Sequence, residues 1–124
     1  MGRRQIRKGI FKHVRDIKNA FYYSLNGIRF LVKERAFKHE LYLGCIIVVI
    51  ELFKNTSPTM RLYLFSSYFF ILVTEAFNSA IETTVNRIGV KKHALSQMAK
   101  DISSAAVFLA IFHFGIVWIL SFVL

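Results

Sequence analysis

The sequence is poor in cysteine, proline and acidic residues, and each shortage excludes something. A single cysteine, Cys45, excludes an intramolecular disulfide framework. One proline beside 13 phenylalanines and five tyrosines excludes a disordered chain, because so many large apolar side chains must be removed from water. Seven acidic residues stand against 17 lysines and arginines, which leaves a net charge of +10.

Apolar residues are what the chain has in excess. They make up 55% of its 124 residues, the mean hydropathy is +0.45, and charged residues make up 19%, below the roughly 25% of a soluble domain. This length suits one domain and is too short for two, so we expect a single domain over residues 1–124. A basic, apolar domain suits either a nucleic acid or a membrane surface, and the positions of the charges distinguish the two.

Three apolar segments, 37–53, 60–86 and 98–124, are candidates to cross a bilayer, which takes roughly 20 apolar residues. The last meets this length by itself, the second meets it with Glu75 included, and the first is marginal. We expect Glu51, near the end of the first segment, to snorkel or to pair with Lys54. The predicted fold is therefore an all-α integral membrane protein with three transmembrane helices.

The basic residues lie at the ends of these segments. Eleven fall between Arg3 and Lys38 and four more between Arg87 and Lys100, whereas the connection around residues 54–61 holds two. The positive-inside rule then predicts a cytoplasmic N-terminus and a multi-pass protein of the cytoplasmic (inner) membrane. Basic stretches beside membrane spans meet anionic lipid headgroups, so we expect no nucleic-acid partner.

Residues 10–33 have the pattern of an amphipathic helix. Apolar side chains recur at spacings of three and four, and basic or amide side chains fill the other faces, which suits a helix lying in the headgroup plane. Gly27 lies inside this stretch, so two shorter helices are an alternative. A soluble helix packed on a partner is another. The apolar positions are Ile10, Val14, Ile17, Phe21, Leu25, Ile28 and Val32.

Polar side chains form one stripe on the second apolar segment. At about 100° per residue, they share an arc roughly 100° wide, and they comprise Glu75, Asn78, Ser79, Glu82 and Asn86. A carboxylate inside a span is costly, which marks Glu75 as a candidate functional residue. Glu34 precedes the first span and Lys100, Asp101 and Ser104 open the third, so we expect them at the same level.

These residue types suit phosphoryl transfer to a membrane lipid. Carboxylate and amide oxygens are the ligands that magnesium prefers, together with phosphate oxygens. A lysine can neutralise phosphate charge, and a partly desolvated carboxylate can accept the proton of a lipid hydroxyl. The alternative is that Glu75, Asn78 and Ser79 only join helices by hydrogen bonds. No Walker-type or kinase-type glycine-rich loop is present in the sequence.

The segment Glu75-Ala-Phe-Asn78-Ser79-Ala-Ile-Glu82, followed by Ala99-Lys100-Asp101 and Ser104-Ala-Ala-Val, closely resembles the signature of the prokaryotic diacylglycerol kinase family. The stretch Glu34-Arg-Ala-Phe extends the resemblance over most of the chain. The family implies an ATP- and Mg2+-dependent lipid kinase of the inner membrane, a homotrimer with active sites shared between subunits. It includes diacylglycerol kinases and undecaprenol kinases, and we expect diacylglycerol as the substrate, with undecaprenol as the alternative.

The resemblance also implies a role for individual residues. Glu75 would be the general base and would lie with Ser104 near the lipid hydroxyl. Glu34 and Glu82 would hold the metal. The nucleotide would be bound by Ala20, Glu34, Asn78, Glu82, His93, Lys100 and Asp101. Asn86 stands where many members carry aspartate.

Two other classes of function fit parts of the same pattern. A small proton-coupled transporter would use Glu75 as its intramembrane acid, but it would not need Lys100 and Asp101 beside it. A non-enzymatic membrane module would need only the basic helix and the packed spans. ATP turnover with either lipid separates both from a lipid kinase.

Overall fold

The computed structural model describes residues 2–89, 91 and 93–123, with the side chains of 2–12 and 14 left out. Its described residues form four helices: α1 (Gly2–Leu31), α2 (Arg35–Phe53), α3 (Pro58–Ile88) and α4 (Ala94–Val123). The chain divides into two compact units, Met1–Glu34 and Arg35–Leu124. Of the positions interpreted above, the side chains of Ile10 and Val14 and the C-terminal Leu124 lie outside the described residues.

The first unit is one continuous helix, α1, which runs through Gly27 without a break. The backbone N–H of Val32 still donates to the carbonyl of Ile28 at 3.0 Å, and a turn at Lys33 and Glu34 ends the helix. The division into two shorter helices is therefore not what the chain adopts. The apolar side chains of Ile17, Phe21 and Ile28 are exposed, as expected for a helix whose apolar face meets a membrane surface.

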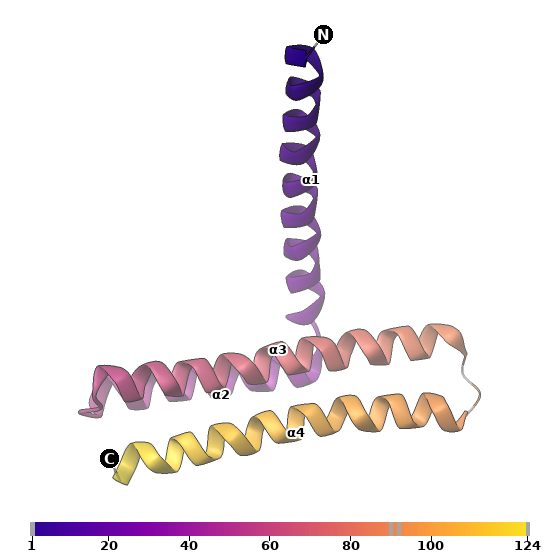
Figure 1. The fold of residues 1–124 in the computed structure, drawn as a ribbon. Helices are drawn as coiled ribbons and strands as arrows, with labels where there is room; N and C mark the ends of the chain where they lie inside the picture. Colours follow the sequence, from indigo (N-terminus) through magenta and orange to yellow (C-terminus); the bar gives the residue numbers. More distant parts are fainter. Residues whose placement is uncertain (1, 90, 92, 124) are drawn as a thin grey trace. The chain divides into compact units, whose positions relative to one another are not determined.

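In the second unit α2, α3 and α4 lie side by side, and each runs antiparallel to the helix before it (Figure 1). Contacts between α3 and α4 are more extensive than those between α2 and α3. Ser57 caps α3 by accepting a hydrogen bond from the N–H of Met60 at 3.3 Å, and Pro58 occupies its first turn. Both are standard signals for a helix start.

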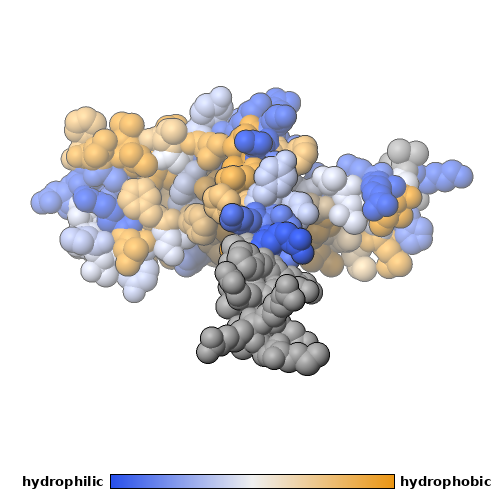
Figure 2. Space-filling model, turned by 90° about the horizontal axis from the view of Figure 1, so that it is seen from above, coloured by the Kyte–Doolittle hydropathy of each residue, from blue (hydrophilic) through white to orange (hydrophobic). Residues whose placement is uncertain are grey.

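The buried core of this unit is small. It consists of five side chains from three helices: Ile47, Leu64, Ile71, Ala110 and Phe114. Large apolar side chains remain open elsewhere, and Figure 2 shows them on the visible face of the unit. Helices α3 and α4 are long and apolar enough to cross a membrane, and only 28% and 17% of their apolar windows are buried inside the protein. Core helices of a soluble protein would be mostly buried, so lipid is the better solvent for these two.

The predicted segments correspond to helices. Segment 60–86 and the described part of segment 98–124 fall in α3 and α4, the two candidate spans, and 37–53 lies inside α2. That α2 also crosses the membrane stays a prediction. The prediction that Glu51 pairs with Lys54 is confirmed, with Nζ of Lys54 3.9 Å from Oε1 of Glu51.

Glu51 belongs to a cluster at the end of the unit opposite to the polar stripe. Its side chain is buried, and Nε of Arg61 lies 3.6 Å from its second carboxylate oxygen. Lys54 also donates a hydrogen bond to Oγ of Ser121 at 2.6 Å and lies over the ring of Phe122, 3.8 Å from its centroid. The cluster therefore ties the α2–α3 connection to the last turns of α4.

Helix α2 approaches α3 closely at Gly44. A Cβ atom at this position would overlap the hydroxyl and the ring of Tyr68. The same hydroxyl donates a hydrogen bond to the backbone carbonyl of Glu40 at 2.8 Å. The absence of a side chain at residue 44 thus allows Tyr68 to fasten α2 to α3.

We expect Gly44→Ala to destabilise the protein, because Tyr68 would have to move and would lose its bond to Glu40. The cost of such overpacking is about 1–3 kcal/mol. Gly115→Ala is the matched control, since no described atom lies within 4 Å of the Cβ it would add. Thermal unfolding in detergent micelles should give a lower midpoint for Gly44→Ala alone. Equal midpoints for the two variants would contradict the close approach.

A second prediction concerns the Glu51 cluster. Lys54→Met removes one cation from a buried carboxylate and should lower the unfolding midpoint, at a cost of up to about 3 kcal/mol. Lys54→Arg keeps the positive charge, so its unfolding midpoint should lie close to that of the wild-type protein. A midpoint unchanged in Lys54→Met would show that Arg61 alone suffices for Glu51.

Candidate functional site

The polar stripe predicted on the second segment lies on α3, and its burial decreases along the helix. Glu75 is buried, with 5% of its surface exposed; Asn78, Ser79 and Glu82 are half-buried, and Asn86 is exposed. The stripe therefore leads from the packed middle of α3 to the α3–α4 connection. A ligand with one apolar and one charged end could meet both environments along it.

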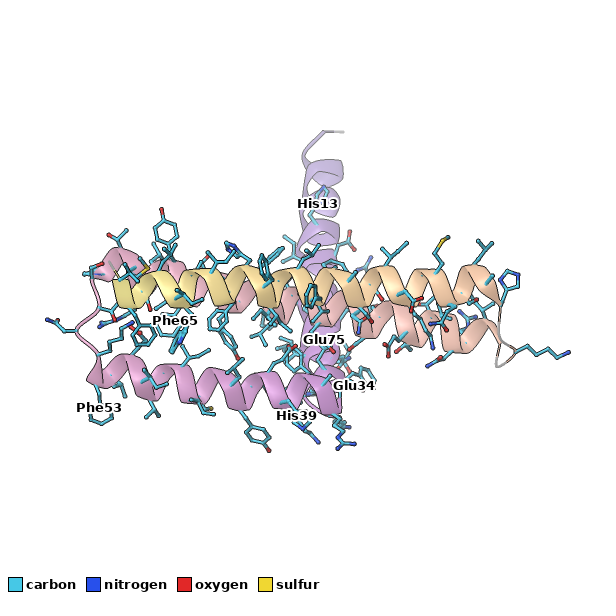
Figure 3. The ribbon with its side chains drawn as sticks, turned by 90° about the horizontal axis from the view of Figure 1, so that it is seen from below. His13, Glu34, His39, Phe53, Phe65 and Glu75 are labelled. Carbon is cyan, nitrogen blue, oxygen red and sulfur yellow. The ribbon has the colours of Figure 1, made fainter. Side chains whose placement is uncertain are left out.

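Glu75 lies on the part of α3 that runs beside the start of α2 (Figure 3). The charge of Glu40, on α2, is close enough to interact with that of Glu75. One carboxylate oxygen of Glu40 is buried and has no hydrogen-bond partner among the described residues. Two carboxylates thus share this region, and sequence reasoning had selected only Glu75. The missed signal was an acid among the charged residues that open α2, directly after Lys38 and His39.

Asn78 connects α3 to α4. Its side-chain oxygen accepts a hydrogen bond from Oγ of Ser103 at 2.6 Å, and its amide nitrogen lies 3.5 Å from a carboxylate oxygen of Glu82. Ser103 is buried at this contact, whereas the predicted Ser104 is exposed. The serine that organises the α3 stripe is therefore Ser103, a residue that sequence reasoning had not selected.

Beyond Glu82, the stripe ends at a cavity of about 350 Å³ between the end of α3 and the start of α4. Nζ of Lys100 donates to Oδ1 of Asn86 at 2.8 Å across this cavity. The amide of Gln97 donates to Oδ1 of Asp101 at the same distance. The described lining residues are Val85, Asn86, Gly89, Lys91, His93, Ser96, Gln97 and Lys100. Lys92 of the predicted basic loop lies outside the described residues.

His93 lines this cavity and directly precedes α4. Its Nδ1 accepts a hydrogen bond from the backbone N–H of Leu95 at 3.2 Å, and its carbonyl accepts one from the N–H of Gln97 at 3.0 Å. The structure thus brings His93 and Lys100 to one cavity, with Asp101 one residue further along α4. Two lysines, Lys91 and Lys100, line the cavity, which suits an anionic ligand.

The remaining predicted residues lie outside this cavity. Ala20 and Glu34 belong to the first unit and are exposed there. Within the described chain, no three histidine, cysteine, aspartate or glutamate side chains are grouped as metal ligands. Magnesium needs only one or two carboxylates when phosphate oxygens complete its shell. The carboxylate of Glu82, 3.5 Å from the amide nitrogen of Asn78, fits that donor set.

Comparison with known proteins places this geometry in a family. Residues 22–122 match the family described as prokaryotic diacylglycerol kinase. This range contains every predicted site residue except Ala20.

Individual relatives of this chain support the same family assignment. The chain is 42% identical over 101 residues to the diacylglycerol kinase of Haemophilus influenzae, covering 81% of this chain and 86% of that protein. It is 40% identical over 97 residues to the enzyme of Escherichia coli K12, covering 77% and 80%, and 33% identical over 106 residues to that of Pseudomonas aeruginosa, covering 85% and 86%. This membrane protein therefore belongs to the prokaryotic diacylglycerol kinase family and is a lipid kinase.

Proposed function

We propose that the chain transfers the γ-phosphoryl group of ATP to the hydroxyl of diacylglycerol, giving phosphatidic acid, at the cytoplasmic face of the inner membrane. The observation that carries this proposal is the stripe from the buried Glu75 to the basic cavity at Lys100, within a chain of this family. A lipid hydroxyl needs the packed, apolar end of such a stripe. A triphosphate needs the exposed, basic end.

Glu75 is the proposed general base. The lipid hydroxyl oxygen attacks the γ-phosphorus, the bond from that phosphorus to the bridging oxygen breaks, and ADP leaves with the bond's electron pair. The hydroxyl proton passes to the carboxylate of Glu75 and from there to water. Burial of Glu75 keeps bulk water from competing with the lipid for the phosphoryl group.

The other predicted site residues bind and orient the nucleotide, its phosphates and the metal ion. Lys100 contacts the β- and γ-phosphates, Asp101 and His93 support the nucleoside end, and Asn78 orients phosphate. Glu34 and Glu82 hold Mg2+, which when bound neutralises charge on the phosphate oxygens. Ser104 lies near the attacking hydroxyl, and Ala20 lies near the nucleotide as a small residue of α1.

The membrane arrangement supports a site at the cytoplasmic boundary. With α2, α3 and α4 as three spans, both the basic N-terminal stretch and the α3–α4 connection lie on the cytoplasmic side, next to ATP. The exposed aromatic side chains of α3, such as Phe69 and Phe77, leave surface for further subunits. We propose a homotrimer in which Glu34 of one subunit can complete the site of another.

The base assignment predicts that Glu75→Gln lowers turnover by about 10²–10⁴-fold, the usual contribution of a general base, with the protein still folded. The assay is phosphorylation of diacylglycerol and, in parallel, of undecaprenol in mixed micelles with MgATP. Asp16→Asn, an exposed acid of α1, is the matched control and should keep full activity.

The two lipid substrates separate the members of the family. Preferential turnover of undecaprenol would reassign the substrate and leave the chemistry in place. If well-folded wild-type protein phosphorylated neither lipid, the kinase proposal would fail. ATP-independent counterflow in proteoliposomes would then favour a transporter that uses Glu75.

The metal assignment predicts that Glu82→Gln raises the Mg2+ concentration needed for half-maximal activity by about tenfold, a loss typical even of groups that only support a metal ligand. Excess Mg2+ should recover much of the activity, which it cannot do for Glu75→Gln. An unchanged Mg2+ dependence would remove Glu82 from the metal site.

A further inference from the structure

We propose that Ser103 is a positioning residue for Asn78: its hydroxyl fixes the side-chain amide so that the N–H groups face Glu82 and the ligand. This inference rests on the proposed function, in which Asn78 orients the phosphate of a bound nucleotide. It gives a role in phosphate orientation to a residue of α4 that acts only through its contact with α3.

Ser103 lies on the face of α4 that packs against α3. Its side chain is buried, with 5% of its surface exposed, and its Oγ lies 2.6 Å from Oδ1 of Asn78. The buried residues of α4 recur at intervals that return to the same side of a helix. They are Ser103, Ala110, Phe114 and Ser121. A hydroxyl at residue 103 is therefore directed at α3, at the level of the polar stripe.

The surroundings of Asn78 decide which way its amide points. One end of an amide accepts hydrogen bonds and the other donates them, whereas an ionised carboxylate only accepts. Nδ2 of Asn78 lies 3.5 Å from Oε1 of Glu82, so the donating end faces the carboxylate. The oxygen end then faces Ser103, which donates to it. With the amide reversed, two acceptors would face each other at Glu82.

The orientation determines what Asn78 offers to a ligand. The contacts to Ser103 and Glu82 are its side-chain hydrogen bonds within the described residues. The amide nitrogen carries two hydrogens, so one is left for a phosphate oxygen. Without the hydroxyl of Ser103, the oxygen end would lose its donor and the amide could turn. A turned amide would present its oxygen to the phosphate and repel it.

A purely structural role for Ser103 makes a different prediction. The hydroxyl also lies 2.9 Å from the carbonyl oxygen of Lys100, a bond inside α4 that needs no partner on α3. If Ser103 only joins or stabilises helices, Ser103→Ala lowers the unfolding midpoint and leaves the kinetic constants of the folded protein unchanged. Under the positioning role, those constants change at temperatures where both proteins are fully folded.

The experiment uses the full-length protein in mixed micelles with MgATP and diacylglycerol, well below the unfolding midpoints. Ser103→Ala should lower kcat/KM for MgATP by about five- to tenfold, in the range of one hydrogen bond. Kd for MgATP, measured by calorimetry, should rise by a similar factor, and KM for diacylglycerol should not change. Ser103→Thr keeps the hydroxyl and should recover most of the loss. If Ser103→Thr does not fold, Ser103→Cys has a weak donor and should give intermediate constants.

Ser67→Ala is the matched control. Ser67 is also a buried serine, with 3% of its surface exposed, and its hydroxyl donates to the carbonyl of Leu64, three residues earlier, at 2.9 Å. This bond has the same spacing and length as that of Ser103 to Lys100. Ser67 has no side-chain partner in the described part of α2, α3 or α4. Ser67→Ala should therefore keep the wild-type constants for both substrates.

A double-mutant cycle shows whether Ser103 acts through Asn78. Kd for MgATP is measured by calorimetry for Ser103→Ala, Asn78→Ala and the double variant, which requires no turnover. If Ser103 only orients Asn78, Ser103→Ala has no further effect once the amide is absent. Losses that simply add would show that Ser103 acts by another route and would overturn the inference.

The outcomes also separate this inference from the function it rests on. Wild-type constants in folded Ser103→Ala overturn the positioning role and leave the kinase proposal intact. A rise in KM for diacylglycerol alone would place Ser103 with the lipid and would also overturn it. Absence of wild-type turnover overturns the kinase proposal, whereas the calorimetric cycle still reports on the link between Ser103 and Asn78.

Discussion

The hydrogen bond from Ser103 to Asn78 is the contact on which the arrangement of the site depends. Helices surrounded by lipid gain little from apolar contact with each other, because the lipid tails are as apolar as their side chains. A hydrogen bond between two polar side chains is different, because at a packed, partly buried contact it has little competition from water. This pair holds α3 and α4 in one register, and with them Glu82, Asn86 and Lys100.

Polar contacts also organise the rest of the second unit, and they gather at its two ends. At one end the stripe of α3 meets the start of α4 around an open cavity. At the other end Glu51, Lys54 and Arg61 form a closed cluster. The small apolar core lies between them, and the close approach of Tyr68 to Gly44 adds α2. One end is thus closed by ion pairs, and the other is an open cavity lined by Lys100.

Much of this could be predicted from the sequence. Amphipathic and apolar periodicity indicated all four helices, and the spacing of Glu75, Asn78 and Glu82 placed them on one stripe. The pairing of Glu51 with Lys54 was predictable because the two are three residues apart. What was missed involves a second helix: the bond of Ser103 to Asn78, Glu40 beside Glu75, and the bond between Asn86 and Lys100. The continuity of α1 through Gly27 was also undecided, because one glycine costs a helix only about 1 kcal/mol.

The chain's local pattern was enough to predict its helical class and its membrane setting, because helix period, charge distribution and residue type are properties of short segments. The tertiary structure alone decided which side chains are partners. Ser103 and Ser104 are equally polar, and only the facing of α4 toward α3 buries one and exposes the other. In the same way, only the packing of α4 against α3 brings Lys100 within hydrogen-bond distance of Asn86.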